Sequence, residues 1–144
     1  MTPDERTAIA DHPTLLYDGV CALCNGVVRF VLRHDRAGVF RFAALDSDAA
    51  RELMDGAAAT QDGVALVLQP LTAAQRILYR SDAVAEALRL LGWRRRAALL
   101  AAVPRPLRES GYGIVARLRY RLFGRYAVCP LPAAEHRKRF VGLR

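Results

Sequence analysis

The chain has 144 residues, and 53% of them are hydrophobic, so it can bury one ordinary core and needs no second domain. Residues 1–12 contain Asp4, Glu5 and Asp11 and no apolar segment, which excludes a secretory signal peptide. No uncharged run reaches the ~18 residues of a membrane-spanning helix. We therefore expect a cytoplasmic protein that is not an integral membrane protein.

Hydrophobic periodicity predicts alternating strands and helices in the first two thirds of the chain. Capping residues support two of the helices, Ser47 for a short one and Ser81 for a longer one. The two apolar runs between these helices are joined by a segment of hairpin length that begins at Pro70. The predicted order is a strand at 14–18, a helix at 22–34, a strand at 39–43, a helix at 47–54, strands at 64–69 and 75–80, and a helix at 81–91.

This is the element order of a thioredoxin-like α/β fold. The helices between the early strands imply parallel pairing, and the hairpin adds an antiparallel edge. We predict a mixed four-stranded sheet with flanking helices, followed by a C-terminal helical extension. In domain terms, residues 1–12 are predicted to form a flexible tail, residues 13–93 the core, and residues 94–144 a basic extension packed on that core.

The formal net charge of +8 is unevenly distributed. Through Trp93 there are 9 basic and 12 acidic residues, whereas from Arg94 onward there are 13 basic and 2 acidic residues, which gives −3 and +11. The basic extension is by default a solvated face. As a functional surface it would bind an anionic partner, such as a membrane surface, an acidic protein or a small anionic thiol like glutathione. No nucleic-acid-binding motif accompanies the arginines, so no nucleic acid is expected as a partner.

Two cysteines, Cys21 and Cys24, follow the first predicted strand and open the first predicted helix. Unpaired amides and the positive end of the helix dipole favour a thiolate at such a position. We expect Cys21 to attack a disulfide, because it is nearest the helix start and should be the more exposed thiol. Cys24, one turn further, would resolve the mixed disulfide. This reaction needs no bound cofactor and no metal.

Two other interpretations of the pair stay open. C-x-x-C is also half of many zinc sites, and Cys129, His34 and His136 could add ligands, although no second C-x-x-C is present. The cysteines could also be buried and inert. Either alternative would make the protein a non-catalytic binding module whose basic helices bind an acidic partner or a membrane surface.

Two further residues have both a structural and a functional interpretation. Asp18 precedes a glycine at a strand end, where an aspartate commonly forms a turn that fixes the entry to the helix. It could also accept the proton of Cys24 during resolution. Cys129 is most simply a small buried residue, and the alternative is a third redox thiol.

Four short motifs stand in order over most of the chain: Asp18-Gly19-Val20-Cys21-Ala22-Leu23-Cys24-Asn25, Ser81-Asp82-Ala83, Arg119-Tyr120-Arg121-Leu122-Phe123-Gly124-Arg125 and Cys129. Together they resemble the DCC family of predicted thiol-disulfide oxidoreductases, which is named for a D-x-x-C-x-x-C pattern. The resemblance implies a thioredoxin-like fold and dithiol-disulfide activity on a protein or small-molecule substrate, with Asp18, Cys21 and Cys24 at the motif positions. Thioredoxins have a cis-proline just before the third strand, whereas Thr60 and Gln61 stand there in this chain.

Overall fold

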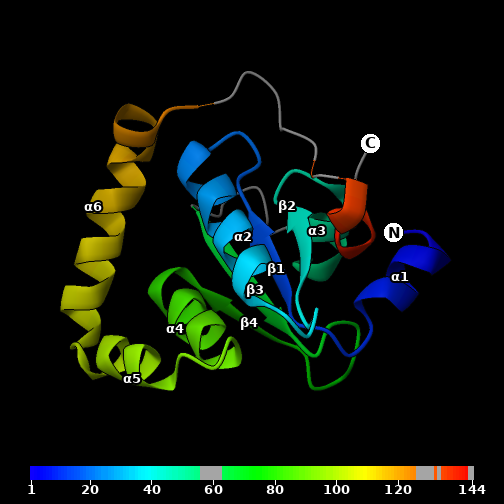
Figure 1. The fold of residues 1–144 in the computed structure, drawn as a ribbon, viewed down its shortest axis with the longest axis horizontal. Coiled ribbons are helices and arrows are strands. Elements are labelled where there is room, and N and C mark those ends of the chain that lie inside the picture. The colour runs from blue at the N-terminus through cyan, green and yellow to red at the C-terminus, as the bar shows by residue number, and fades with distance from the viewer. Residues whose placement is uncertain (56–62, 126–131, 133, 143–144) are drawn as a thin grey trace.

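A four-stranded mixed sheet lies at the centre of the structure, a computed structural model that describes residues 1–55, 63–125, 132 and 134–142 (Figure 1). The strand order is β2-β1-β3-β4. Strand β1 pairs parallel with β2, and β3 runs antiparallel to both β1 and β4. The predicted thioredoxin-like α/β class and the mixed sheet are thus confirmed. The strands are β1 (Thr14–Tyr17), β2 (Arg41–Ala44), β3 (Val64–Leu68) and β4 (Arg76–Tyr79).

Helices cover both faces of this sheet. One hydrophobic cluster joins the sheet to α2 and α4, and a second joins the opposite face to α1 and α3. The remaining helices, α5 and α6, extend beyond α4, and α6 lies along the outer side of α2 (Figure 1). The helices are α1 (Pro3–Ile9), α2 (Ala22–His34), α3 (Asp48–Leu53), α4 (Arg80–Leu90), α5 (Arg94–Ala102), α6 (Arg105–Phe123) and the 3-10 helix η2 (Ala134–Arg139).

Alternating side chains of the central strands supply both clusters. Leu15 and Leu66 belong to the cluster beneath α2 and α4, whereas Leu16 and Val67 belong to the cluster beneath α1 and α3. Burial of each such side chain contributes roughly 1.5–3 kcal/mol. Because all of β1 is buried, the turn that follows it and carries the cysteines starts from a fixed strand end.

The first twelve residues, predicted as a flexible tail, instead contain helix α1. Thr2 and Glu5 form a reciprocal capping box at its start, and Ile9 at its end is fully buried. The carboxylate of Glu5 also accepts a hydrogen bond of 3.0 Å from the amide of Gly142. The burial of Ile9 and the ion pairs of the N-terminal amine and Arg6 with Glu52 hold this segment on the core. The proposed division at residue 93 between core and extension stays a prediction.

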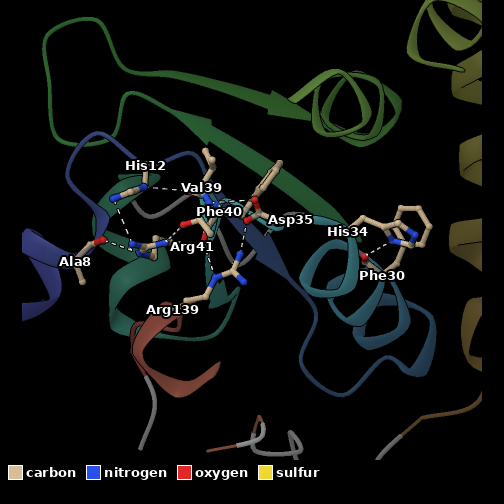
Figure 2. Close-up of polar contacts among 10 residues, drawn as sticks. Ala8, His12, Phe30, His34, Asp35, Val39, Phe40, Arg41 and Arg139 are labelled. Carbon is tan, nitrogen blue, oxygen red and sulfur yellow. Dashed lines mark hydrogen bonds and ion pairs between the residues drawn. The ribbon is translucent and has the colours of Figure 1, made fainter. Parts of the chain in front are cut away.

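The last described residues return to the sheet next to β2. Phe140 forms an isolated parallel bridge with Phe42, and the two rings stack with centroids 5.0 Å apart. The buried guanidinium of Arg139 pairs with the buried carboxylate of Asp35, which also accepts a 2.8 Å hydrogen bond from the amide of Phe40 (Figure 2). This ion pair fastens the C-terminal segment to the loop between α2 and β2.

Two carboxylates join helix α6 to the start of α4, namely Glu109 and Asp82, which pairs with Arg105 at 2.9 Å and with Arg108 at 2.8 Å. Glu109 accepts a hydrogen bond from the hydroxyl of Ser81 and forms a 2.8 Å ion pair with Arg80. The prediction that Ser81 caps the helix is wrong, because α4 begins at Arg80 and its N-cap, Tyr79, makes no side-chain capping bond. The hydroxyl of Ser81 donates its hydrogen bond to Glu109 on α6 instead.

Over the described parts of the chain, none of the helices combines the length and the apolar character that crossing a bilayer requires.

Candidate redox site

Cys21 is the N-cap residue of α2. Its backbone is extended, and its sulfur accepts a hydrogen bond of 3.4 Å from the amide of Cys24. A cysteine sulfur thus occupies the place that a serine or aspartate oxygen usually takes at a helix start. Both cysteines are free thiols, and the first turn of α2 holds them next to each other. The predicted location of the pair is confirmed.

Both thiols are buried. Cys21 is 0% exposed and Cys24 is 3% exposed, so the expectation that Cys21 is the more accessible thiol is wrong. The cause lies after α6, where Arg125 forms an antiparallel bridge with Cys21 and the carbonyl of Gly124 accepts a 3.2 Å hydrogen bond from the amide of Ala22. Periodicity within residues 14–34 contains no information about this distant segment.

The turn before Cys21 is held by two side chains. Asp18 accepts a 3.1 Å hydrogen bond from the amide of Val20, which confirms the predicted structural role in the turn. The side-chain amide of Asn25 donates to the carbonyls of Gly19, at 2.7 Å, and Cys21, at 2.9 Å. Asn25 belongs to the motif that carries the family resemblance, but sequence reasoning gave it no role. Together these bonds fix the backbone on both sides of Cys21.

The second carboxylate oxygen of Asp18 faces helix α6. It accepts a hydrogen bond from the hydroxyl of Tyr120, and the guanidinium of Arg119 lies 3.6 Å away. Arg119 also stacks on the Tyr120 ring at 4.6 Å. Burial, and next the bond to Asp18, raise the pKa of Tyr120, so the phenol keeps its proton and donates it. The closing motif Arg119–Arg125 of the resemblance was the sequence signal for these residues.

Burial is the largest cause that raises the pKa of the Cys24 thiol, to about 12, and the neighbouring Cys21 adds to the effect. The charge of Asp18 raises this pKa as well, whereas a hydrogen bond involving the Asp18 backbone lowers it. Cys24 is therefore a neutral thiol at physiological pH. Its ionisation requires a proton acceptor or a change in its surroundings, which is the pattern expected of a resolving cysteine rather than an attacking one.

The Cys24 side chain lines a cavity. The cavity has a volume of about 410 Å³, lies between α2, α4 and α6, and is walled mainly by apolar side chains such as Leu23, Val27 and Val115. Tyr112 forms another part of the wall, and its hydroxyl accepts a 3.1 Å hydrogen bond from the amide of Val64 at the start of β3.

This contact explains the glycine before β3. A Cβ atom at Gly63 would lie 2.2 Å from the Tyr112 oxygen, and the φ angle of Gly63 is +82°. The described residues contain no cis peptide bond, and Thr60 and Gln61, which stand where thioredoxins have their cis-proline, lie outside them.

A metal site is not assembled in the described part of the chain, where no group of three His, Cys, Asp or Glu side chains converges. His34 lies at the opposite end of α2 from the cysteines, about 20 Å along the helix axis, and its ring contacts the carbonyl of Phe30 at 2.8 Å (Figure 2). His136 contacts Glu135 within η2 at 3.2 Å. Cys129, the remaining candidate ligand or redox thiol, lies outside the described residues.

Comparison with known proteins gives relatives over most of the chain. It is 34% identical to the uncharacterized protein YuxK of Bacillus subtilis (strain 168) over 128 residues, which cover 88% of this chain and 92% of that protein. It is 37% identical to the chloroplastic DCC family protein At1g52590 of Arabidopsis thaliana over 122 residues, covering 83% and 70% of the two chains. No solved structure matches the chain.

The family model described as DCC1-like thiol-disulfide oxidoreductase matches residues 15–125. The match runs from β1 through the cysteine pair to the segment that bridges Cys21, so it includes every element that builds the redox site. The chain belongs to the DCC1-like thiol-disulfide oxidoreductase family.

Proposed function

We propose that the protein is a thiol-disulfide oxidoreductase in which Cys21 attacks and Cys24 resolves. The observation that carries this proposal is the 3.4 Å contact between the Cys21 sulfur and the Cys24 amide at the start of α2. A helix N-terminus stabilises negative charge on the sulfur that caps it. Cys24, whose pKa is raised, is the thiol that stays protonated until a mixed disulfide forms.

The reaction transfers two electrons from the dithiol to a substrate disulfide. The Cys21 thiolate attacks one substrate sulfur, forms a mixed disulfide and releases the other sulfur as a thiolate. Cys24 then loses its proton and attacks the Cys21 sulfur, forming the Cys21–Cys24 disulfide and releasing the second substrate thiolate. A thiol reductant restores the dithiol, and the same steps in reverse oxidise a dithiol substrate.

Asp18 is the proposed acceptor of the Cys24 proton. The charge of its carboxylate raises the Cys24 pKa, and Tyr120 and Arg119 hold this carboxylate in place. Resolution by a thiol whose pKa is about 12 is slow without such an acceptor. The substrate must also reach Cys21, which requires Gly124 and Arg125 to separate from the turn during the reaction.

The proposal includes the compartment in which the protein works and the partners that it meets there. The dithiol works in a reducing cytoplasm on protein or small-molecule thiols and disulfides. The arginine-rich helices α5 and α6 are proposed to bind an anionic partner, since residues 94–125 contain nine arginines and one acidic residue, Glu109.

Trapping the mixed disulfide tests the proposed order of attack. In a Cys129→Ser background, which removes the third thiol of the chain, Cys24→Ser should accumulate a stable mixed disulfide between Cys21 and one half of a small aromatic disulfide, because no other thiol is left to resolve it. Cys21→Ser should form no adduct in the same time, and the wild type should form the internal disulfide, which a glutathione buffer titrates. An adduct that forms equally well on Cys24 in the Cys21→Ser variant would overturn the assignment of roles, and stoichiometric zinc that protects both thiols would overturn the function.

A further inference from the structure

Exposed apolar side chains are concentrated on α5 and α6. In the part of the chain that the structure describes, every exposed large apolar side chain except Leu71 lies between Leu99 and Phe123. Leu99 is 70% exposed, and Leu107 and Leu122 are each 66% exposed. Single exposed leucines are common on proteins, but such a concentration on two consecutive helices marks an interaction surface.

These side chains form a stripe along α6. Successive residues of a helix are rotated by about 100°, so the exposed Leu107, Ile114 and Leu122 lie on one side of it, together with the half-buried Leu118. The opposite side of α6, which carries Tyr112 and Ala116, faces the cavity beside Cys24. The stripe thus lies on the outer side of a helix whose inner side contacts α2 and α4, and Leu107, at one end of the stripe, also reaches the cavity.

Arginines border this stripe. Arg117 and Arg121 are exposed and lie along one edge of it, and Arg94, Arg95 and Arg96 are exposed at the start of α5. Glu109, the one acidic residue of the two helices, is engaged by Arg80 and Ser81 on the inner side. The outer face therefore combines aliphatic side chains with positive charge alone.

We propose that the outer face of α5 and α6 docks on the surface of an anionic lipid bilayer. A helix with an apolar stripe and bordering arginines lies in the plane of the bilayer interface, with its aliphatic side chains among the acyl chains and its arginines at the headgroups. A second copy of the chain would place two faces of the same positive charge against each other. An acidic protein would neutralise the arginines but would need an exposed apolar strip of its own.

The same docking connects the membrane with the redox site. Leu107 and Val115 are exposed and also line the cavity that contains Cys24, so the rim of this cavity lies at the edge of the docking face. If the proposed function holds, the disulfides that reach the site include those of molecules held at the membrane interface.

Vesicle co-sedimentation of the full chain tests the docking face. Wild-type protein should bind vesicles of phosphatidylcholine containing one quarter phosphatidylglycerol at least about tenfold more tightly than vesicles of phosphatidylcholine alone. The double variant Leu107→Ser/Leu122→Ser should lose binding, and Arg117→Gln/Arg121→Gln should weaken it by about fivefold for each arginine removed. Leu71→Ser, a matched change of an exposed leucine on the β3–β4 turn, should bind like the wild type.

Three outcomes would overturn the proposal: no binding to the anionic vesicles, equal binding to both vesicle types, or wild-type binding by the double leucine variant. A dimer in light scattering that the leucine changes dissolve, without vesicle binding, would assign the face to self-association instead. Circular dichroism checks that the variants fold. Reduction of a small disulfide without vesicles is measured separately, so failure of membrane docking and failure of the redox function are distinguishable.

Discussion

The hydroxyl of Tyr120 donates a hydrogen bond to the carboxylate of Asp18, a residue 102 positions earlier in the chain. Asp18 lies in the turn that presents Cys21, and Tyr120 lies near the end of α6. Through this bond helix α6 contributes to the redox site directly. Four predictions concern this relationship and the surroundings of the two thiols.

Tyr120→Phe should slow thiol-disulfide exchange by about tenfold, because a hydrogen bond to a charged group contributes roughly 1.5 kcal/mol. The pH profile of the rate should change shape as well, since the proposed proton acceptor loses a donor. Tyr112→Phe is the matched control, because it removes a hydroxyl of the same helix that accepts its hydrogen bond from the Val64 amide at the start of β3. Stopped-flow reduction of an aromatic disulfide measures both effects. Indistinguishable pH profiles for the two variants would count against the positioning role of Tyr120.

The thiol of Cys24 should titrate above its ordinary pKa of 9.0, because burial is the largest cause of its shift. In Cys21→Ser/Cys129→Ser, where Cys24 is the last thiol of the chain, thiolate absorbance in the ultraviolet should therefore appear well above pH 9.0. A titration with a midpoint at or below the ordinary value would contradict the burial seen here. Chemical unfolding at each pH shows that the protein is still native.

The same shift makes stability depend on pH. The native state holds the Cys24 proton up to about pH 12, whereas the unfolded chain loses it near pH 9.0. This contribution to the free energy of unfolding is complete below pH 9.0 and is lost as the pH rises toward about 12. Cys24→Ala should show a shallower decline of the urea midpoint over that range than the wild type does. If the urea midpoints of Cys24→Ala and wild type declined equally steeply with pH, a group other than Cys24 would cause the loss of stability.

Gly124→Ala should accelerate alkylation of Cys21. Gly124 has a φ angle of +93°, and a Cβ there meets no atom within 4 Å, so the substitution strains the backbone without a clash. Such strain costs on the order of 1–3 kcal/mol and is relieved when this segment leaves Cys21. The expected result is a rate of iodoacetamide modification raised by about tenfold.

Gly92→Ala is the control for that experiment, because its φ angle is +88°, it too has open space around a Cβ, and it ends α4 away from the thiols. The two variants should be destabilised to a similar degree. Equal acceleration of Cys21 alkylation in both would attribute the effect to global unfolding and would contradict a covering role of Gly124.

Glu109→Gln should loosen α6 from α4. The bond from Ser81 and the ion pair with Arg80 lower the pKa of Glu109, so its stabilising contribution is present above the ordinary value of 4.5 and is lost as the pH falls below it. We expect a loss of about 1 kcal/mol near neutral pH and a smaller loss in acid. Glu86→Gln is the control, since the pKa of Glu86 is also lowered but its partner Arg89 belongs to the same helix. Thermal unfolding at several pH values separates the two, and equal effects would contradict the bridging role of Glu109.

The local parts of the fold could be predicted from the sequence because their signals are local. The bounds of α2 follow from its apolar period and from Asp35 after His34, and Cys21 was correctly expected at the helix start. The Ser47 cap was predicted correctly, and Ser81 was not, because Glu109 on a distant helix competes for its hydroxyl. A capping residue predicts a cap only where no stronger partner reaches it.

The sequence predicts where the two cysteines and Asp18 lie, but not which other residues surround them. Two thiols three residues apart at a strand-to-helix junction are visible in the sequence, and so is the turn-forming Asp18. The burial of Cys21 by Gly124 and Arg125 is not visible, since it depends on where a helix about 100 residues later ends. Periodicity says which face of α6 is apolar, but not that its polar residues meet Asp18.

The distance in sequence between Asp18 and Tyr120 has a consequence for the protein while it is being made. A ribosome releases Cys21 and Cys24 long before it has synthesised α6. Until that helix docks, the thiols have neither the burial that keeps Cys24 protonated nor the tyrosine and arginine that hold Asp18. Contacts between residues so far apart form late, because closing long loops is entropically costly. The burial that raises the Cys24 pKa and the contacts that hold Asp18 are therefore acquired late in folding, when α6 docks.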